Sequence, residues 1–575
     1  MAPKLRTWFL PAVALLLLLA SCSKTNQQGK LVPKDAAAVL HINGKSLNEK
    51  LPWDEVKQNP LFQQAYADST LPGFMKAILD NPDNSGIDIK TDLLIFVEKD
   101  SLGGYAAIEG TVKDEAKFKQ FNLDASKGSL TDENGLHFIS KTPAIVGWNK
   151  DKFVYVIDIP GMKKRNRYDF SDDTLVPPPV KRDLLAACKS VFSLKSENSL
   201  GEDERFTSLM KKQGDIHFWL NTEQLYKSVN SDLGMLNMMK LDKFYEGNLM
   251  VATGNFDNGK ISLEYTSYLG KELKKIIKEY SGGQVNEEML KRIPGQQVGA
   301  VFAMHFKPEG IRKLVELSGM EGLLNIGLIS MGFTMDDFIK ANKGDIMVAL
   351  TDFKVKNDSI TLPGMKGDDM TFGMRPEPKP DVLFAASIGD KDAFNTLIKA
   401  GKRISKDRSA DEDNLISYNM NDQFFAIGNS KANVDKFIGG STAKFDFISH
   451  ISGEPMAGYA DLQYLMKNFP VQESDSLEKV TYEASLKLWE NVYLKGGNYE
   501  DGGLSYHIEI NLLDKNTNSL KQLNQYFGLI GRIMEEKRKK DEARFKDFTI
   551  QTETDSIAPV VSPVPGAAPN VKKHR

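Results

Sequence analysis

The order of structural elements suggested by this 575-residue sequence occurs twice along the chain. Residues 32–42 ("VPKDAAAVLHI") and residues 293–304 ("IPGQQVGAVFAM") each place a proline turn before an apolar, β-rich run. A helical segment rich in Leu, Met and Gly follows each run, and strands return at "DLLIFVEKD" and "DIMVALTDF". An internal repeat limits the possible folds, because each element in one copy needs a counterpart in the other.

Two later parts of the pattern also return. Residues 110–121 match residues 386–398, and Asp114 and Asp390 are both expected at a helix N-terminus, where the helix dipole favours negative charge. The segments "GNFDNGKISLEYTSY" and "GNYEDGGLSYHIEIN", which start at Gly254 and Gly497, predict hairpins with tight turns at "DNG" and "EDGG". The competing explanation is that two unrelated stretches share the same mixed composition.

We therefore predict an α+β fold of two tandem related halves, each with a mostly antiparallel sheet and packed helices. The first half is expected at residues 31–283 and the second at 290–534. Dense mixed charge predicts a solvated helix at 535–550. The proline-rich tail at 551–575 cannot bury a core and is predicted to be disordered.

The N-terminus has the features of an export signal. Lys4 and Arg6 precede an apolar run at 10–20, which is too short to span a bilayer. This pattern predicts a signal peptide at residues 1–21. The sequence Leu-Ala-Ser-Cys that ends at Cys22 resembles the lipobox of bacterial lipoproteins, in which the cysteine is acylated, and residues 22–30 then form a tether. The alternative is an ordinary signal followed by a chance cysteine.

The composition is that of an exported globular protein without a nucleic-acid partner. Hydrophobic residues make up 41% of the chain, charged residues make up 26%, and the formal net charge is -3. The only other cysteine, Cys188, lies in an apolar helical context, so we expect a small buried thiol and no internal disulfide.

Catalytic motifs are present only as fragments. Gly44-Lys45-Ser46 matches the end of a phosphate-binding loop, but Val39 occupies the position of its first glycine. Several S-x-x-K segments occur without the K-T-G that completes a penicillin-binding serine site. We therefore predict neither an enzymatic activity nor a cofactor.

Residues 81–92 contain the one candidate metal site. Asn81, Asp83 and Ser85 occupy the first ligand positions of a calcium loop, and Asp92 occupies the last. The same residue types form helix caps and turns, and we favour that interpretation over a metal site.

A short pattern of Asp, then Ser or Thr, then an apolar residue or Thr occurs six times. It resembles the O-glycosylation signal of exported proteins in one group of anaerobic Gram-negative bacteria. The alternative is surface turns rich in Asp and Ser. The candidate sites are Ser69, Ser101, Thr174, Ser359, Ser476 and Ser556.

Two helical segments are unusually rich in methionine. One contains Met235, Met238 and Met239, and the other contains Met331 and Met335. Such stripes usually belong to a core. The alternative is an exposed groove for an apolar helix, an acyl chain or a partner protein.

The lipobox, the opening "VPKDAAAVLHINGKSL" and the later "SLKSENSLGEDERFTSLMKKQGDIHFWLN" resemble a family of large Gram-negative lipoproteins known only as a domain of unknown function. The resemblance covers residues 30–540 and implies an envelope lipoprotein, with Cys22 as its single transferable site. Ser23 follows the cysteine, and "SKTNQQGK" contains no acidic run. By analogy, these features favour an outer-membrane anchor and a periplasmic orientation.

Two classes of function follow. The first is a non-catalytic binding or assembly protein, held to the membrane by its N-terminal lipid and engaged with a protein partner. The alternative is a hydrolase that acts on an envelope polymer through a site assembled from distant loops.

Overall fold

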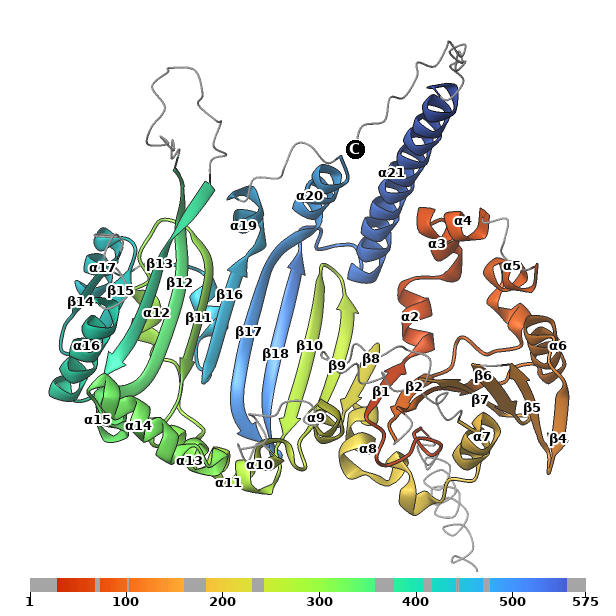
Figure 1. The fold of residues 1–575 in the computed structure, drawn as a ribbon, viewed down its shortest axis with the longest axis horizontal. Helices are drawn as coiled ribbons and strands as arrows, with labels where there is room; N and C mark the ends of the chain where they lie inside the picture. Colours follow the sequence, from red (N-terminus) through yellow and green to blue (C-terminus); the bar gives the residue numbers. More distant parts are fainter. Residues whose placement is uncertain are drawn as a thin grey trace, which may run out of the picture.

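The computed structural model describes residues 28–67, 73–100, 103–141, 143–159, 182–229, 242–356, 377–406, 416–440, 442, 444–468 and 476–555. These residues form a single antiparallel sheet of 18 strands with helices packed around it, which confirms the α+β class (Figure 1). None of the described helices is both long and apolar enough to cross a membrane.

The first half of the chain contributes ten strands. Strands β4 to β7 pair one after another as hairpins and form the outermost part of this half. The order across the sheet is β4-β5-β6-β7-β3-β2-β1-β8-β9-β10. The bounds are β1 (Ala38–Ile42), β2 (Leu93–Glu98), β3 (Tyr105–Thr111), β4 (Leu130–Glu133), β5 (Leu136–Lys141), β6 (Ala144–Trp148), β7 (Lys152–Asp158), β8 (Ile216–Leu220), β9 (Leu249–Asp257) and β10 (Lys260–Tyr268).

The second half contributes eight strands in the order β18-β17-β16-β11-β12-β13-β15-β14. The bounds are β11 (Val298–His305), β12 (Asn342–Lys356), β13 (Glu377–Ile388), β14 (Ser417–Met420), β15 (Phe424–Gly428), β16 (Met456–Asp461), β17 (Trp489–Glu500) and β18 (Gly503–Leu512).

The two halves meet where β10 pairs with β18 along nine residues of each strand. Outward from this seam the strand order is β10-β9-β8-β1-β2-β3 on one side and β18-β17-β16-β11-β12-β13 on the other. In each half the last three strands, in reverse, are followed by the first three, so the strand order is the same on both sides. The halves therefore share one sheet, whereas the sequence suggested a sheet for each. Their common origin stays a prediction that superposition would test.

The hairpins at the seam have the predicted turns. The β9–β10 turn contains Gly259 at φ 66°, and the β17–β18 turn places Asp501 and Gly502 at φ 48° and 88°. In the β17–β18 turn both central residues have positive φ, which gives the left-handed turn whose twist matches antiparallel strands, whereas in the β9–β10 turn Gly259 alone has it. Gly254 and Gly497 lie in the first strand of each hairpin, as expected.

Helices cover one face of the sheet along most of its width. The core of the first half lies under α7 (Leu184–Phe192) and α8 (Glu204–Lys211), and that of the second half lies under α12 (Glu287–Lys291), α17 (Lys431–Ile438) and α18 (Phe447–Ile451). The opposite face is covered near its two ends by α6 (Glu115–Ser126) and α16 (Lys391–Lys406). In both helices the predicted aspartate accepts a hydrogen bond at the N-terminus, from Lys117 N to Asp114 and from Ala393 N to Asp390.

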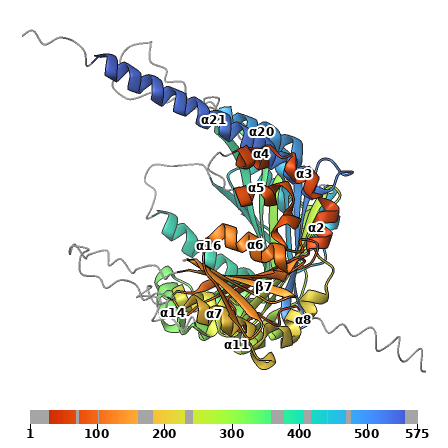
Figure 2. The same cartoon turned by 90° about the vertical axis from the view of Figure 1, so that its right-hand side faces the viewer.

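The remaining helices lie at the two edges of the sheet where the strands end (Figures 1 and 2). They are α2 (Gly44–Lys50), α3 (Trp53–Lys57), α4 (Pro60–Ala67), α5 (Gly73–Asp80), α9 (Thr222–Val229), α10 (Asp242–Tyr245), α11 (Lys271–Tyr280), α13 (Pro308–Ser318), α14 (Glu321–Met331), α15 (Met335–Ala341), α19 (Leu462–Asn468), α20 (Ser476–Leu488) and α21 (Ser519–Asp555).

The C-terminal helix differs from the prediction. The charged helix expected at 535–550 is the outer part of α21, which runs without a break from Ser519 to Asp555 and therefore also enters the predicted tail. The beginning of α21 packs on the first half of the chain, where Lys521 pairs with Glu55 at 2.6 Å. Residues 556–575 lie outside the described part of the chain.

Candidate functional site

One face of the sheet carries rows of apolar side chains that run across strands from both halves. Cross-strand partners in an antiparallel sheet point to the same face, so the register identifies each row. The middle row crosses eleven strands and contains, in order, Phe384, Val348, Phe302, Gly458, Leu494, Ile508, Leu263, Gly254, Ile216, Ile42 and Leu93.

The flanking rows have the same character. The row on one side contains Val382, Leu350, Ala300, Ala460, Val492, Ile510, Ile261 and Phe256. The row on the other side contains Ala386, Ile346, Met304, Met456, Gly496, Tyr506, Tyr265, Ala252, Phe218, Leu40 and Ile95. We call these three rows the apolar floor, and none of their residues is charged.

None of the helices in the described ranges packs over the middle of the apolar floor. Phe118 of α6 packs near one end, and Phe394 of α16 packs near the other. Between them, Phe302 is 39% exposed and Val348 is 40% exposed. Figure 1 looks onto this region, where the central strands have no helix drawn in front of them. Apolar surface of this extent is uncommon on a monomer unless it binds something.

The opposite face of the same central strands is polar. Glu264 of β10 and Lys495 of β17 are exposed there, and Lys260 pairs with Glu509 at 2.9 Å. A cleft of about 600 Å³ between these strands and α8 is lined by Glu264, Lys495 and His507. The usual arrangement is therefore reversed at the seam, because the polar face has neighbouring helices while no described helix packs on the middle of the apolar face.

The chemistry of the apolar floor limits what it can recognise. The backbone groups of its strands are already paired in the sheet, and its side chains offer hydrogen-bonding groups only at Tyr265 and Tyr506. Those two rings stack with centroids 4.6 Å apart. An apolar pocket of about 180 Å³ opens beside them, between Met304, Met456 and helices α11 and α13. The surface therefore suits apolar atoms and not a polar polymer.

Three buried polar residues of the first half, His41, His217 and Asp215, are held by partners within the fold. His41 Nδ1 lies 2.9 Å from His217 Nδ1, and His217 Nε2 lies 3.0 Å from the carbonyl of Lys212. Burial, together with the nearby charge of His41, lowers the pKa of His217. Asp215 accepts hydrogen bonds from Lys50 Nζ and from Ser46 Oγ at 2.6 and 2.5 Å. Ser46 belongs to the Gly44-Lys45-Ser46 segment, which forms the start of α2.

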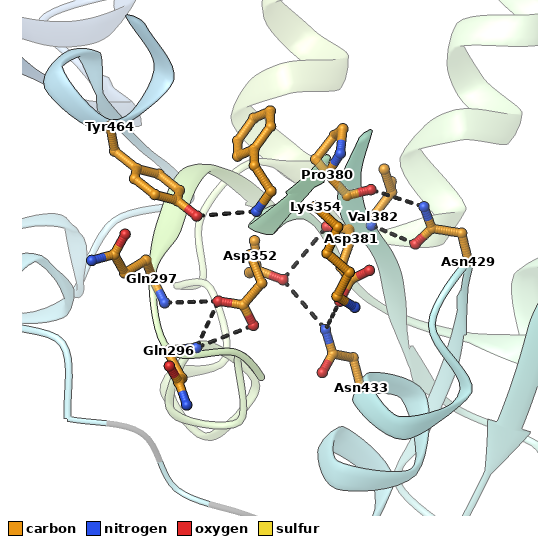
Figure 3. A network of polar contacts seen from close by, with 12 residues as sticks. Gln296, Gln297, Asp352, Lys354, Pro380, Asp381, Val382, Asn429, Asn433 and Tyr464 are labelled. Atoms are coloured by element: carbon orange, nitrogen blue, oxygen red, sulfur yellow. Dashed lines mark hydrogen bonds and ion pairs between the residues drawn. The ribbon is translucent and has the colours of Figure 1, made fainter. Parts of the chain in front are cut away.

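A second polar network fixes the bulge between β12 and β13 (Figure 3). Asp352 has a φ of 39°, and its carboxylate accepts backbone hydrogen bonds from Gln296 and Gln297 at 2.9 and 3.0 Å. Beside it, Asp381 pairs with Lys354 at 2.6 Å. These carboxylates are occupied by partners within the fold, so we assign the network a role in holding the strand ends.

The predicted modification sites lie almost entirely outside the described part of the chain. Ser476 is the exception and is the first residue of α20. Outside the description are Cys22, Ser69, Ser101, Thr174, Ser359 and Ser556.

The candidate calcium residues form a cap and a turn. Asn81 caps the short helix η1 (Pro82–Ser85) by accepting from the backbone N–H of Asp83, and Ser85 Oγ donates to a carbonyl of that helix at 2.6 Å. Asp83 pairs with Lys113 at 2.7 Å, while the carboxylate of Asp92 accepts a hydrogen bond from the side-chain amide of Gln28, in the segment before β1. Within the described ranges, no group of three or more His, Cys, Asp or Glu residues could hold a metal ion.

The remaining candidates from the sequence are Cys188 and the methionines, and those that the structure describes belong to the core. Cys188 is fully buried, and burial raises the pKa of its thiol to about 12. Met335 is buried and Met331 is half-buried in the cluster between α14 and α15, while Met235, Met238 and Met239 lie outside the described residues.

Sequence reasoning missed the apolar floor, although a signal was present. Strands β1, β2 and β8 ("AVLHI", "LLIFVE" and "IHFWL") are apolar on both faces, whereas a half-exposed strand alternates with polar residues. Such strands require a covering layer or a ligand on each side.

Comparison with known proteins gives a family and no further function. The model of a family described as a domain of unknown function (DUF4836) matches residues 29–371. No curated protein matches the chain. Among solved structures, crystal form I of TP0453 is 12% identical with a TM-score of 0.24, covering 42% of this chain and 78% of that one. Crystal form III is 11% identical with a TM-score of 0.25, covering 47% and 87%.

Proposed function

The chain belongs to DUF4836, a family described as a domain of unknown function, and we propose that it is a non-catalytic binding protein. In this proposal the apolar floor holds an apolar ligand or the apolar surface of a partner. Cys22 carries the lipid that anchors the protein to the outer membrane, with the folded part in the periplasm.

The observation that carries the binding role is the exposed, charge-free middle of the floor. Phe302 and Val348 are direct cross-strand partners, and each leaves about two fifths of its surface in water. Full burial of such side chains is worth about 1.5–3 kcal/mol each. A ligand that covers this pair and the adjacent residues therefore gains free energy without needing polar contacts.

Photo-crosslinking in living cells tests the binding role. A photoreactive residue at Val348 lies on the floor, and the matched control at Lys495 lies exposed on the opposite face of the same sheet. We expect Val348 to trap a lipid or a protein that mass spectrometry identifies, and Lys495 to trap neither. Equal labelling at both positions, or none at Val348, would remove the proposal.

The same experiment separates the alternative, a hydrolase acting on an envelope polymer. A polar polymer would have to bind in the cleft beside α8, which is lined by the exposed Glu264 and the half-buried His507. Capture of polymer fragments at Lys495, together with none at Val348, would favour the hydrolase.

The anchor has its own test. The variant Cys22→Ala cannot be acylated, so we expect it to leave the outer-membrane fraction and to appear as soluble or unprocessed protein, because stable attachment needs covalent acyl chains. Fractionation after a high-salt wash measures this change, and Cys188→Ser serves as the control. Retention of Cys22→Ala in outer membranes would show that the lipobox interpretation is wrong.

A further inference from the structure

Helix α14 exposes three aliphatic side chains on one face. Leu323, Ile326 and Ile329 are 63%, 68% and 64% exposed, and their spacing of three residues places them on the same side of the helix. The other side of α14 packs through Leu328 and Met331 onto the cluster shared with α15. The methionine that sequence reasoning singled out therefore faces the core, while isoleucines and a leucine face outward.

This outer face carries no charged side chain beside its aliphatic residues, and its polar residue, Ser330, donates its hydroxyl within the helix to the carbonyl of Gly327 at 2.7 Å. The charged residue of α14 is Glu321 in its first turn, and the rest of the helix reads "GLLNIGLISM". A surface helix of a globular protein normally presents charged or polar residues to solvent. Adjacent exposed aliphatic residues of this kind mark a contact surface.

The position of α14 indicates what this surface contacts. The strand before α13 and α14 ends at His305, and the register places that end on the same edge of the sheet as Ala38, the start of β1. The chain enters β1 along this edge, where Ser199 Oγ donates to the carbonyl of Gly29 at 2.7 Å. Figure 1 shows α8, α11, α13 and α14 together along this edge.

The short distance to the proposed anchor brings this edge to the membrane. Residues 23–27 lie between Cys22 and the first described residue, Gln28, and the six Cα-to-Cα steps from one to the other span at most about 20 Å. This step rests on the proposed acylation of Cys22. Beside α13, the exposed helix α11 ("KELKKIIKEY") carries four lysines against two glutamates, which suits a surface of lipid phosphates.

We propose that α14 inserts Leu323, Ile326 and Ile329 into the interfacial layer of the bilayer, as a second membrane contact beside the lipid anchor. A helix with an apolar outer face lies in the plane of the interface and buries that face among the acyl chains. With two contacts on one edge, the sheet stands upright on the membrane, which leaves the apolar floor accessible from the side.

Vesicle flotation without the lipid anchor tests the proposal. The chain from residue 23 onward is mixed with vesicles of phosphatidylethanolamine and phosphatidylglycerol and centrifuged through a density gradient. We expect the unchanged chain to float and Ile326→Ser to lower the bound fraction by about tenfold, since a large aliphatic side chain no longer enters the apolar layer. The matched control is Leu513→Ser, because Leu513 is 42% exposed where β18 ends at the opposite edge.

A second measurement separates insertion from loss of folding. Thermal unfolding should show the same midpoint for Ile326→Ser as for the unchanged chain, because the position is exposed. An environment-sensitive fluorophore at Ile326→Cys should shift to shorter wavelength when vesicles are added. Flotation that is equal in both serine variants overturns the proposal. So does an Ile326→Ser variant that converts a dimer to a monomer in analytical ultracentrifugation with unchanged flotation, because the face would then bind a second copy.

The outcome is independent of the proposed function. The anchor is absent from the vesicle experiment, so failure of Cys22 acylation does not change flotation. Conversely, loss of flotation leaves crosslinking at Val348 of the anchored protein unchanged, because Val348 lies on the floor of the sheet and not on α14.

Discussion

At the residue scale, two carboxyl groups lie where the sheet disfavours charge. Burial, with repulsion from Asp35 and Asp100, raises the pKa of Glu98 to about 8. Burial also raises the pKa of Glu109, although its ion pair with Lys152 at 3.1 Å acts in the opposite direction. Such groups bind a proton more tightly in the folded state than in the unfolded chain, and therefore make stability depend on pH.

The first prediction concerns Glu98. Its folded pKa of about 8 exceeds the unfolded value of 4.5, so the stability it contributes is complete below pH 4.5 and declines as the pH rises to 8. Glu98→Gln keeps the shape without the charge, and should weaken this decline and raise stability at pH 8. Urea unfolding at pH 5, 6.5 and 8 measures the effect. An unchanged slope in the variant would show that another group carries it, and Glu204→Gln at the exposed start of α8 is the control.

At the element scale, the two helices that cover the ends of the apolar floor have matching starts. Asp114 accepts from Lys117 N at 3.0 Å to begin α6, and Asp390 accepts from Ala393 N at 2.8 Å to begin α16. These caps were predictable because an aspartate placed before an amphipathic segment is a local signal. The apolar residues that the two helices bury differ, since Phe118 stacks on Phe153 whereas Phe394 contacts Phe425.

The second prediction follows from these caps. Asp114→Ala and Asp390→Ala should each reduce the free energy of unfolding by about 1 kcal/mol, because each leaves a helix N–H group without its side-chain acceptor. Asp114→Asn and Asp390→Asn should restore most of the loss, since asparagine caps comparably. Thermal or urea denaturation gives the comparison. Equal losses from the alanine and asparagine variants would point to charge instead of capping.

At the scale of the whole molecule, the seam between β10 and β18 makes one body of the two halves. Nine residues of each strand pair there, from Lys260 with Asn511 to Tyr268 with Gly503. The end of the chain also returns to its beginning, because Asn59 Nδ2 donates to the carbonyl of Asn524 at 2.6 Å. A separated half would expose a long strand edge, which native sheets avoid.

The third prediction tests this unity. If the chain is divided between Gly282 and Gly283, where both glycines have positive φ, the two pieces expressed together should copurify as one complex. Each piece expressed alone should aggregate, because its seam strand lacks a partner. Size-exclusion chromatography of the tagged pieces measures the association. Two soluble, independently folded pieces that do not associate would show that the halves are separate domains.

Local signals in the sequence determined the α+β class, the hairpin turns at Gly259 and Gly502 and the helix starts at Asp114 and Asp390. Each depends on a few neighbouring residues whose backbone preferences need no distant partner. Alternation likewise indicated which residues of a strand share a face.

Only the tertiary structure decided which of those faces remained open. The row from Phe384 to Leu93 exists because strands from both halves pair in one register, and the contact of β10 with β18 joins segments about 250 residues apart. The outward face of α14 was also hidden from the sequence, because both sides of that helix are apolar and only packing against α15 distinguishes them. Whether a face of a strand or helix is covered depends on how distant elements pack in the folded chain. The residue pattern shows that a face is apolar, but it does not determine which element packs over that face.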